Sequence, residues 1–510
     1  MRRILLSKRR KTLLVAGLVI LVGLGTYVGF FAYAVNDYNQ TAYNLQAPNP
    51  EDFIPANGSL LYAMAMWYEQ NIANFHMPED MIMSTWFNST QGGVPTSYAV
   101  DYDSAEWTGH YLMAEACRYA WNERNGNSAQ CNDALANIQR ALHGIDIILH
   151  VAPNGGMARY AWPIADYPGD PDHLADNFYR STWNGTDYIY EDDTSRDMHN
   201  GVMMGLGLTF LLVNDTGIRT VAKTLVETLL DYLISHGWLY VDPNGDPNGT
   251  DLGPGFWVFG TSGIWTLAYL KVGALVNPEK YAALYRKCAI DLDYVHRGQF
   301  PQSTRMNVIS EYFGLLLEWE TLFPLILLEN DTSLRNMFIE YIQRNVYDLT
   351  KYDRNAEFNM FWCAINNITQ ESSPNANVIG DIGDCLMRYY TAIQRFPGRG
   401  VNLDQPDLRN PTADRWTDFF DSEAGQVLYP FANSIFEFQN ISKTALTPDL
   451  RPFCDYLWSY SPYLYESGKA TTLESSGADF LAVYWPCLYF NILPPPASYS
   501  AAIIVNYPGA

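Results

Sequence analysis

The chain has 510 residues, with 55 acidic against 32 basic side chains and a formal net charge of −23 at pH 7. A surface this acidic is ill suited to nucleic acid or anionic lipid, and it favours solubility or cation binding. No G-x-S-x-G, P-loop or dinucleotide fingerprint occurs in the sequence. These absences argue against a common serine hydrolase, an NTPase and a Rossmann enzyme. No C-x-x-C or H-E-x-x-H pattern is present either, so we predict no metal site.

The N-terminus has the pattern of a membrane anchor. Residues 13–35 are mostly apolar, a run that reaches the roughly 20 residues needed to span a bilayer as a helix. Only basic charges precede it, so the positive-inside rule predicts a cytoplasmic tail at 1–12 and a main domain outside the cell or in a lumen. A cleaved signal peptide is the alternative. We favour a retained transmembrane signal anchor, because the run is long for a signal peptide and has no small-x-small exit.

Two further patterns fit an exported protein. N-x-S/T sequons, which become N-linked glycosylation sites on export, occur at Asn39, Asn57, Asn88, Asn184, Asn214, Asn248, Asn330, Asn367 and Asn440. Outside the cytoplasm cysteines can form disulfides. Cysteines that are close in sequence predict three disulfides and leave Cys288 unpaired: Cys117–Cys131, Cys363–Cys385 and Cys454–Cys487. The connectivity cannot be read from the sequence alone.

Beyond a polar stalk at 36–58, the pattern predicts one helical domain over 59–493 and a tail at 494–510. Apolar helical stretches alternate with Gly/Pro/Asn-rich loops, mostly as helix, tight turn, helix and longer loop. We expect helices near 59–75, 104–123, 129–150, 196–213, 217–236, 257–276, 278–294, 308–328, 333–347, 380–395, 424–439 and 470–491. The predicted fold is all-α, an (α/α)6 toroid of helical hairpins preceded by one N-terminal transmembrane helix.

The segment 188–212 concentrates ionisable groups directly before an apolar helix, which we expect from Ser195 to about Val213. Clustered carboxylates raise one another's pKa, so one can act as an acid while another acts as a base. The alternative is a helix start whose acids complement the helix dipole. The candidate catalytic residues here are Asp192, Asp193 and Asp197, and the candidate substrate-binding residues are Arg196, His199 and Asn200.

Other candidates lie on separate segments. Ser104 is a potential helix cap, and Glu106, Trp107 and His110 then fall in the first turns of that helix. A carboxylate beside a tryptophan suits a sugar site, although a capped helix with aromatic packing explains the pattern as well. Arg159 stands on a loop after two glycines. Trp362 and Trp485 are further substrate-binding candidates that core packing would equally explain.

One loop has half of a calcium-binding pattern. Asp242, Asn244 and Asp246 alternate as in the first half of a calcium loop, but Gly253 occupies the position of the expected glutamate. A turn-rich loop without a metal is the favoured interpretation.

Four segments, EWTGHYLMAEACRYAW, GGMARY, EDDTSRDMHNGVMMGLGLTFLL and SGADFLAVYW, resemble the six-hairpin glycosidase-like superfamily, and within it a set of poorly characterised exported proteins. They spread from about residue 100 to 490. Endo-mannanases of this superfamily carry an Asp-Asp pair at an inner-helix start, similar to Asp192-Asp193. In the endo-mannanases this Asp-Asp pair is followed by tryptophans, whereas this chain has Thr194, Ser195 and Arg196 at those positions. The resemblance implies that Asp193 is the general acid or base, that Asp192 is its partner, and that Asp197 or Glu106 is the second carboxylate.

Together these features predict a membrane-anchored, carbohydrate-active protein whose partner is a glycan, most simply a glycoside hydrolase. A polysaccharide lyase or sugar epimerase on the same scaffold is one alternative, with Tyr188, His199 and Arg196 as its reactive groups. A non-catalytic glycan-binding or structural surface glycoprotein is the other.

Overall fold

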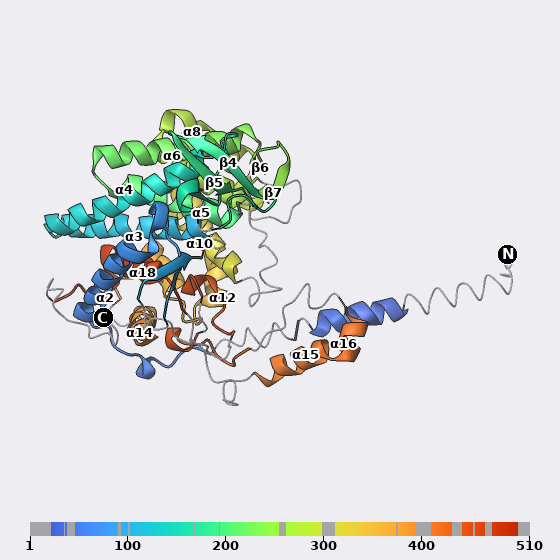
Figure 1. The fold of residues 1–510 in the computed structure, drawn as a ribbon. Helices are drawn as coiled ribbons and strands as arrows, with labels where there is room; N and C mark the ends of the chain where they lie inside the picture. Colours follow the sequence, from blue (N-terminus) through green and yellow to red (C-terminus); the bar gives the residue numbers. More distant parts are fainter. Residues whose placement is uncertain are drawn as a thin grey trace, which may run out of the picture.

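The computed structural model describes most of the chain. The residues described are 22–34, 36–37, 46–89, 93–99, 103–167, 169–192, 194–253, 262–297, 312–373, 376–392, 410–430, 441–451, 454–464 and 472–497. Most of them are helical, as Figure 1 shows. One large apolar core runs through the body of the molecule.

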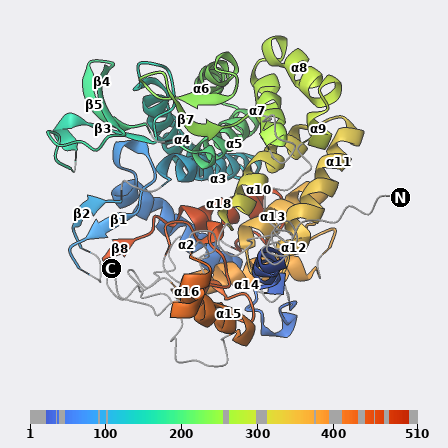
Figure 2. The same cartoon turned by 90° about the vertical axis from the view of Figure 1, so that its right-hand side faces the viewer.

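Six helices form a closed inner ring in which each helix contacts the next and the last contacts the first. Figure 2 shows them around the centre of the molecule. They are α3 (Ser104–Arg124), α5 (Arg196–Leu212), α7 (Ser262–Val276), α10 (Phe313–Leu328), α13 (Ala356–Asn366) and α18 (Ala478–Tyr489). Their side chains are buried on nearly every face wherever burial is described, as expected for helices surrounded by others.

A second set of helices packs outside this ring. Five of them directly follow their inner partners along the chain: α4 (Ser128–His150), α6 (Thr216–Ser235), α8 (Pro278–Arg286), α11 (Thr332–Ile342) and α14 (Asn377–Ala392). The sixth, α2 (Gly58–Asn71), comes before α3 and packs on α18 and α14, so the two ends of the domain meet. Four shorter helices complete the set: α9 (Tyr294–Arg297), α12 (Asp348–Thr350), α15 (Pro411–Asp421) and α16 (Glu423–Leu428).

Short polar caps make the tight turns between paired helices. Asn127, Asp215, Asn277 and Asp331 each accept a backbone N–H from the first turn of the outer helix that follows. Such a cap satisfies one of the unpaired donors at a helix start. These residues let the chain reverse within a few positions.

Within the described parts of the chain, eight short strands form three small antiparallel sheets on the helical body. One sheet has the order β2 (Pro95–Tyr98), β1 (Thr85–Phe87) and β8 (Leu473–Glu474); a hairpin joins β6 (Leu239–Val241) to β7 (Pro247–Asp251). The third sheet has the order β3 (Tyr160–Pro163), β5 (Thr186–Glu191) and β4 (Phe178–Trp183). It leads the chain into α5, and it holds Arg159 next to Glu191 through a backbone hydrogen bond of 2.8 Å.

The predicted fold class is wrong in two respects. Strands accompany the helices, and among the described residues no helix is both long and apolar enough to cross a membrane. This finding overturns the predicted transmembrane helix at 13–35 and the single-pass localisation drawn from it; residues 1–21 and 35 lie outside the described residues. The described part, 22–34, is helical and packs through Phe31 and Ala34 on a small apolar cluster with Trp416 and Phe420.

The predicted disulfides are also wrong, because none of the seven cysteines forms a disulfide bond. Most are buried and serve as small apolar side chains in the core. The Sγ of Cys385, for example, lies 3.3 Å from the carbonyl oxygen of Arg354 rather than beside Cys363. The stretch 46–57, assigned to a stalk from the sequence, runs against α14, where the backbone N–H of Ile54 donates to Asp384.

Helices α3 and α5 approach each other closely. A Cβ atom added to Gly109 would lie 2.1 Å from the carbonyl oxygen of Gly201, and one added to Gly205 would lie 2.4 Å from that of Gly109. Only glycine therefore allows the two backbones to touch here. This contact sets the distance between the first turns of the two helices.

We expect Gly109→Ala to destabilise the protein by about 3 kcal/mol or more, because the obstructing atoms are backbone and cannot rotate away. The free energy of unfolding, measured with urea, tests this. Gly380→Ala on the outer helix α14 is the matched control, since its added Cβ meets only the side chain of Phe53. Equal effects of the two substitutions would contradict the role given to Gly109.

Candidate functional site

Three carboxyl groups meet where α3 and α5 begin. Asp103 precedes α3, Glu106 lies in its first turn, and Asp197 lies in the first turn of α5. One oxygen from each lies within 4.8 Å of the others. Asp103 and Asp197 are partly exposed, whereas Glu106 is buried. We call these residues the outer group.

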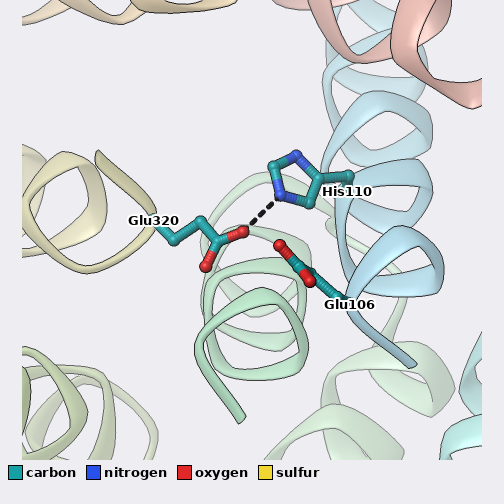
Figure 3. A group of neighbouring side chains, drawn as sticks. All are labelled: Glu106, His110 and Glu320. Carbon is teal, nitrogen blue, oxygen red and sulfur yellow. Dashed lines mark hydrogen bonds and ion pairs between the residues drawn. The ribbon is translucent and has the colours of Figure 1, made fainter. Parts of the chain in front are cut away.

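A second, buried layer lies one turn further along α3. The Nε2 atom of His110 is 2.7 Å from Oε1 of Glu320 on α10, and its Nδ1 atom is 2.9 Å from Oε1 of Glu357 on α13. Figure 3 shows Glu106 and His110 extending from α3 towards Glu320. The hydroxyl of Tyr456 donates to Glu357 at 2.7 Å and lies 2.8 Å from the same Nδ1 atom. We call His110, Glu320, Glu357 and Tyr456 the inner group.

The three carboxyl groups of the outer group lie in different electrostatic environments, which shift their pKa values. Burial, together with Asp103 and Glu320, raises the pKa of Asp197 to about 7. Burial also raises the pKa of Asp103, but Arg159 opposes this through an ion pair of 2.9 Å. Burial and the charges of Glu320, Asp197 and Asp103 hold the pKa of Glu106 well above its usual range. At neutral pH the outer group therefore contains both protonated and ionised carboxyl groups.

The inner group contains a cation. Burial favours neutral His110, but the carboxylates of Glu357 and Glu320 outweigh burial and raise its pKa to about 9. The imidazole is therefore protonated at neutral pH and lies between two carboxylates. Burial also raises the pKa of Glu357, which the contact with His110 opposes.

Of the remaining catalytic candidates, Asp192 does not join the two groups. Asp192 is buried, and its Oδ1 accepts a hydrogen bond of 2.8 Å from the hydroxyl of Tyr240. Asp193 lies outside the described residues. Helix α5 spans Arg196–Leu212 after Ser195, as the sequence predicts, but the Ser195 side chain makes no capping bond.

Among the substrate-binding candidates, His110 and Arg159 belong to the site, and Trp107 supports it. The Trp107 ring stacks on Tyr456 at 4.1 Å, and its Nε1 donates to Asp455 at 2.9 Å. With both contacts made and only 5% of the residue exposed, Trp107 positions Tyr456 and offers little surface to a ligand. Ser104 does not cap α3; its hydroxyl donates to the carbonyl oxygen of Ile82.

The α5 candidates make other contacts. Arg196 donates to the carbonyl oxygen of Asp251 and lies over the Trp265 ring. Asn200 accepts a hydrogen bond from Tyr269. His199 is fully buried, its Nδ1 lies 2.7 Å from the carbonyl oxygen of Ser195, and burial lowers its pKa to about 4.

Two tryptophan candidates pack elsewhere. Trp362 stacks on Tyr347 at 4.1 Å, and Trp485 donates from Nε1 to Glu69 at 2.7 Å. In the loop with half of a calcium-binding pattern, Oδ1 of Asp242 accepts hydrogen bonds from the backbone N–H groups of Asn244 and Asp246. That carboxylate therefore already stabilises the β6–β7 turn.

The sequence interpretation missed several site residues. It did not single out Asp103, although this residue directly precedes the potential cap Ser104, and it missed Glu320, Glu357 and Tyr456. Glu320 carried a usable signal, because a glutamate inside the continuously apolar helix 313–328 must find a buried partner. Glu357 lies on α13, a helix that was not predicted.

Two sets of side chains are spaced to hold a metal ion: Glu106, His110 and Glu320, and separately the three members of the outer group. Comparison with known proteins adds no assignment. No family model matches this chain, and searches of curated proteins and of solved structures give no match.

We expect His199 to make the fold less stable in acid. Its pKa of about 4 in the folded protein lies below the usual 6.5, so between these pH values the unfolded chain binds a proton at His199 that the folded chain does not bind. This contribution to stability is present above pH 6.5 and is lost as the pH falls towards 4, by up to about 3 kcal/mol at roughly 1.4 kcal/mol per pKa unit.

Unfolding by urea at pH 7 and pH 5 measures this effect. His199→Asn, whose amide nitrogen can replace Nδ1, should show a smaller loss of stability between these pH values than the unchanged protein. Because the other titrating groups are common to both proteins, identical losses would contradict the prediction.

Proposed function

We propose that this protein hydrolyses glycosidic bonds in a neutral glycan, using Asp197 as the general acid and Asp103 as the ionised carboxylate. The observation that carries the proposal is the placement of two partly exposed carboxyl groups in unlike environments within 4.8 Å of each other. Asp103 has a cation beside it, whereas no ion pair of Asp197 occurs within the described residues. Glycosidases need this division between a proton donor and an ionised partner.

The charge around the site favours an uncharged substrate. The outer and inner groups together hold five carboxyl groups, while the cationic side chains are His110 and Arg159, both engaged with carboxylates. A lyase or epimerase acting on a uronate needs a cation to neutralise the substrate carboxylate. Arg196, the other cation considered, is directed to a backbone carbonyl and a tryptophan ring. These contacts support hydrolysis of a neutral glycan over uronate chemistry.

An aromatic surface for a sugar ring is available near Asp103. Tyr460 is 46% exposed, and its hydroxyl interacts with Asp455 and feels the charge of Asp103. A half-exposed ring held at its polar end is suited to stack on a pyranose face.

We expect Asp197→Asn to lower kcat/KM on neutral polysaccharides by at least about 100-fold, because an amide cannot donate the catalytic proton. Purified full-length protein would be screened on mannans, glucans and uronate polymers, with release of reducing ends and ultraviolet absorbance followed together. Asp146→Asn, which changes a partly exposed carboxylate of the outer helix α4, is the matched control.

Three results would count against hydrolysis. Unsaturated products at ultraviolet wavelengths would indicate a lyase. Glycan binding without turnover would indicate a non-catalytic protein, and full activity of Asp197→Asn would remove the proposed acid.

We also expect hydrolysis to retain the anomeric configuration. The oxygens of Asp103 and Asp197 lie within 4.8 Å, close to the about 5–5.5 Å of retaining enzymes and far from the about 6.5–9.5 Å that leaves room for a water in inverting ones. Proton NMR of the first product formed distinguishes the two outcomes, and an inverted anomer would contradict the assignment of Asp103.

A further inference from the structure

We infer that Glu106, His110 and Glu320 form a binding site for one divalent ion of the first transition row, with Zn²⁺ or Mn²⁺ as the test ions. The inference goes beyond the proposed activity and does not depend on it. It concerns the place where the outer and inner groups meet, and it adds a ligand to residues that the hydrolysis proposal leaves without a direct role.

The spacing of the donor atoms supports this site. Glu106 and His110 are four residues apart on α3, so they lie on one face of the helix, and Glu320 faces them from α10 (Figure 3). One donor atom from each lies within 4.8 Å of the others, and His110 Nε2 is 2.7 Å from Glu320 Oε1. Ligands with bonds of about 2.1 Å to one ion lie about 3 Å apart, so shifts of an ångström or two would close the site.

The surroundings orient the imidazole as a metal ligand. Nδ1 of His110 faces Glu357 at 2.9 Å, and Nε2 is directed towards Glu320, so binding of an ion would displace the Nε2 proton and use this nitrogen as the ligand. Histidines that bind metals usually donate their other N–H group to a carboxylate in this way. Tyr456 hydrogen-bonds the same Glu357 oxygen, so the carboxylate that orients the ring is itself held in place.

The unsatisfied oxygen of Glu320 is an independent observation. Its Oε2 atom is buried and has no hydrogen-bond partner within the described part of the chain, and the side chain is completely shielded from solvent. A buried oxygen that lacks a hydrogen-bond partner is costly, and coordination to a metal would satisfy it. Glu106 adds a second buried carboxyl group beside it, and an ion placed between them would stabilise the ionised form of both.

The donor types select the class of ion. Imidazole nitrogen with carboxylate oxygens suits zinc, manganese or iron, whereas calcium and magnesium prefer oxygen alone. No cysteine belongs to this group of described side chains, so thiolate-bound zinc is excluded.

Metal binding to the full-length protein tests the inference without any substrate. After treatment with a chelator and its removal, isothermal titration with Zn²⁺ and Mn²⁺ should give one ion per chain, and elemental analysis after dialysis should give the same ratio. Bound Co²⁺ should show visible absorption bands typical of a nitrogen- and oxygen-ligated ion, a readout that needs no variant.

Glu320→Gln should weaken binding at least about tenfold, since a carboxylate ligand is lost. Glu357→Gln, which changes only the residue that orients His110, should weaken it about 10- to 100-fold while the ratio stays at one ion per chain. Glu318→Gln is the matched control, because Glu318 is also buried on α10 but lies beside Tyr341. Circular dichroism and thermal melting without metal establish that each variant is folded.

Three results would overturn the inference: no ion bound by the folded protein, equal affinity in Glu320→Gln, or saturation by Ca²⁺ or Mg²⁺ in place of Zn²⁺ and Mn²⁺. Loss of hydrolysis without loss of metal binding would reject only the proposed function. Hydrolysis by a protein that binds no metal would reject only the metal site.

Discussion

The contact between α3 and α5 brings together the carboxyl groups of the outer group, on which the proposed chemistry of this protein depends. Gly109, Gly201 and Gly205 remove the side chains that would separate the two helices, so their backbones touch. The first turns of both helices then come together, and Glu106 meets Asp197. A larger residue at any of these glycines would move the acids apart. The chemistry of the site thus depends on three residues that carry no functional groups.

This contact also produces the gradient of burial across the site. Asp103 and Asp197 stand at the helix starts, where the chain is partly open to solvent. His110 and Glu357 lie deeper and are completely buried. The side chains of the inner group are less accessible to water than those of the outer group, and this strengthens the interaction between neighbouring charges. The outer group is consequently suited to exchange protons with a ligand, and the inner group is suited to hold a fixed arrangement.

The sequence was informative where local pattern and tertiary contact agree. Helices α3 and α5 have polar residues in their first turns and mostly small or apolar residues after them, and four predicted residues, Glu106, His110, Arg159 and Asp197, do converge. The predictions failed where partners come from distant segments. Tyr456 lies in a loop with no motif, and α13 is short and rich in aromatic residues, so Glu357 could not be placed. Sequence also could not show that Trp107 and Trp485 would use their ring nitrogens on buried acids.

The first helix of the outer set, α2, and the last helix of the inner ring, α18, are joined by polar contacts as well as by packing. Trp485 donates to Glu69 across 416 positions of sequence, and Glu69 also pairs with the buried Arg118 of α3. During synthesis, Glu69 and Arg118 emerge from the ribosome long before Trp485. The ring therefore cannot close until almost the whole chain has been made, and contacts of such long range form slowly. A shortened chain would leave the apolar sides of α2 and α3 uncovered, so production of this protein in a cell depends on protecting those surfaces until the C-terminal helix arrives.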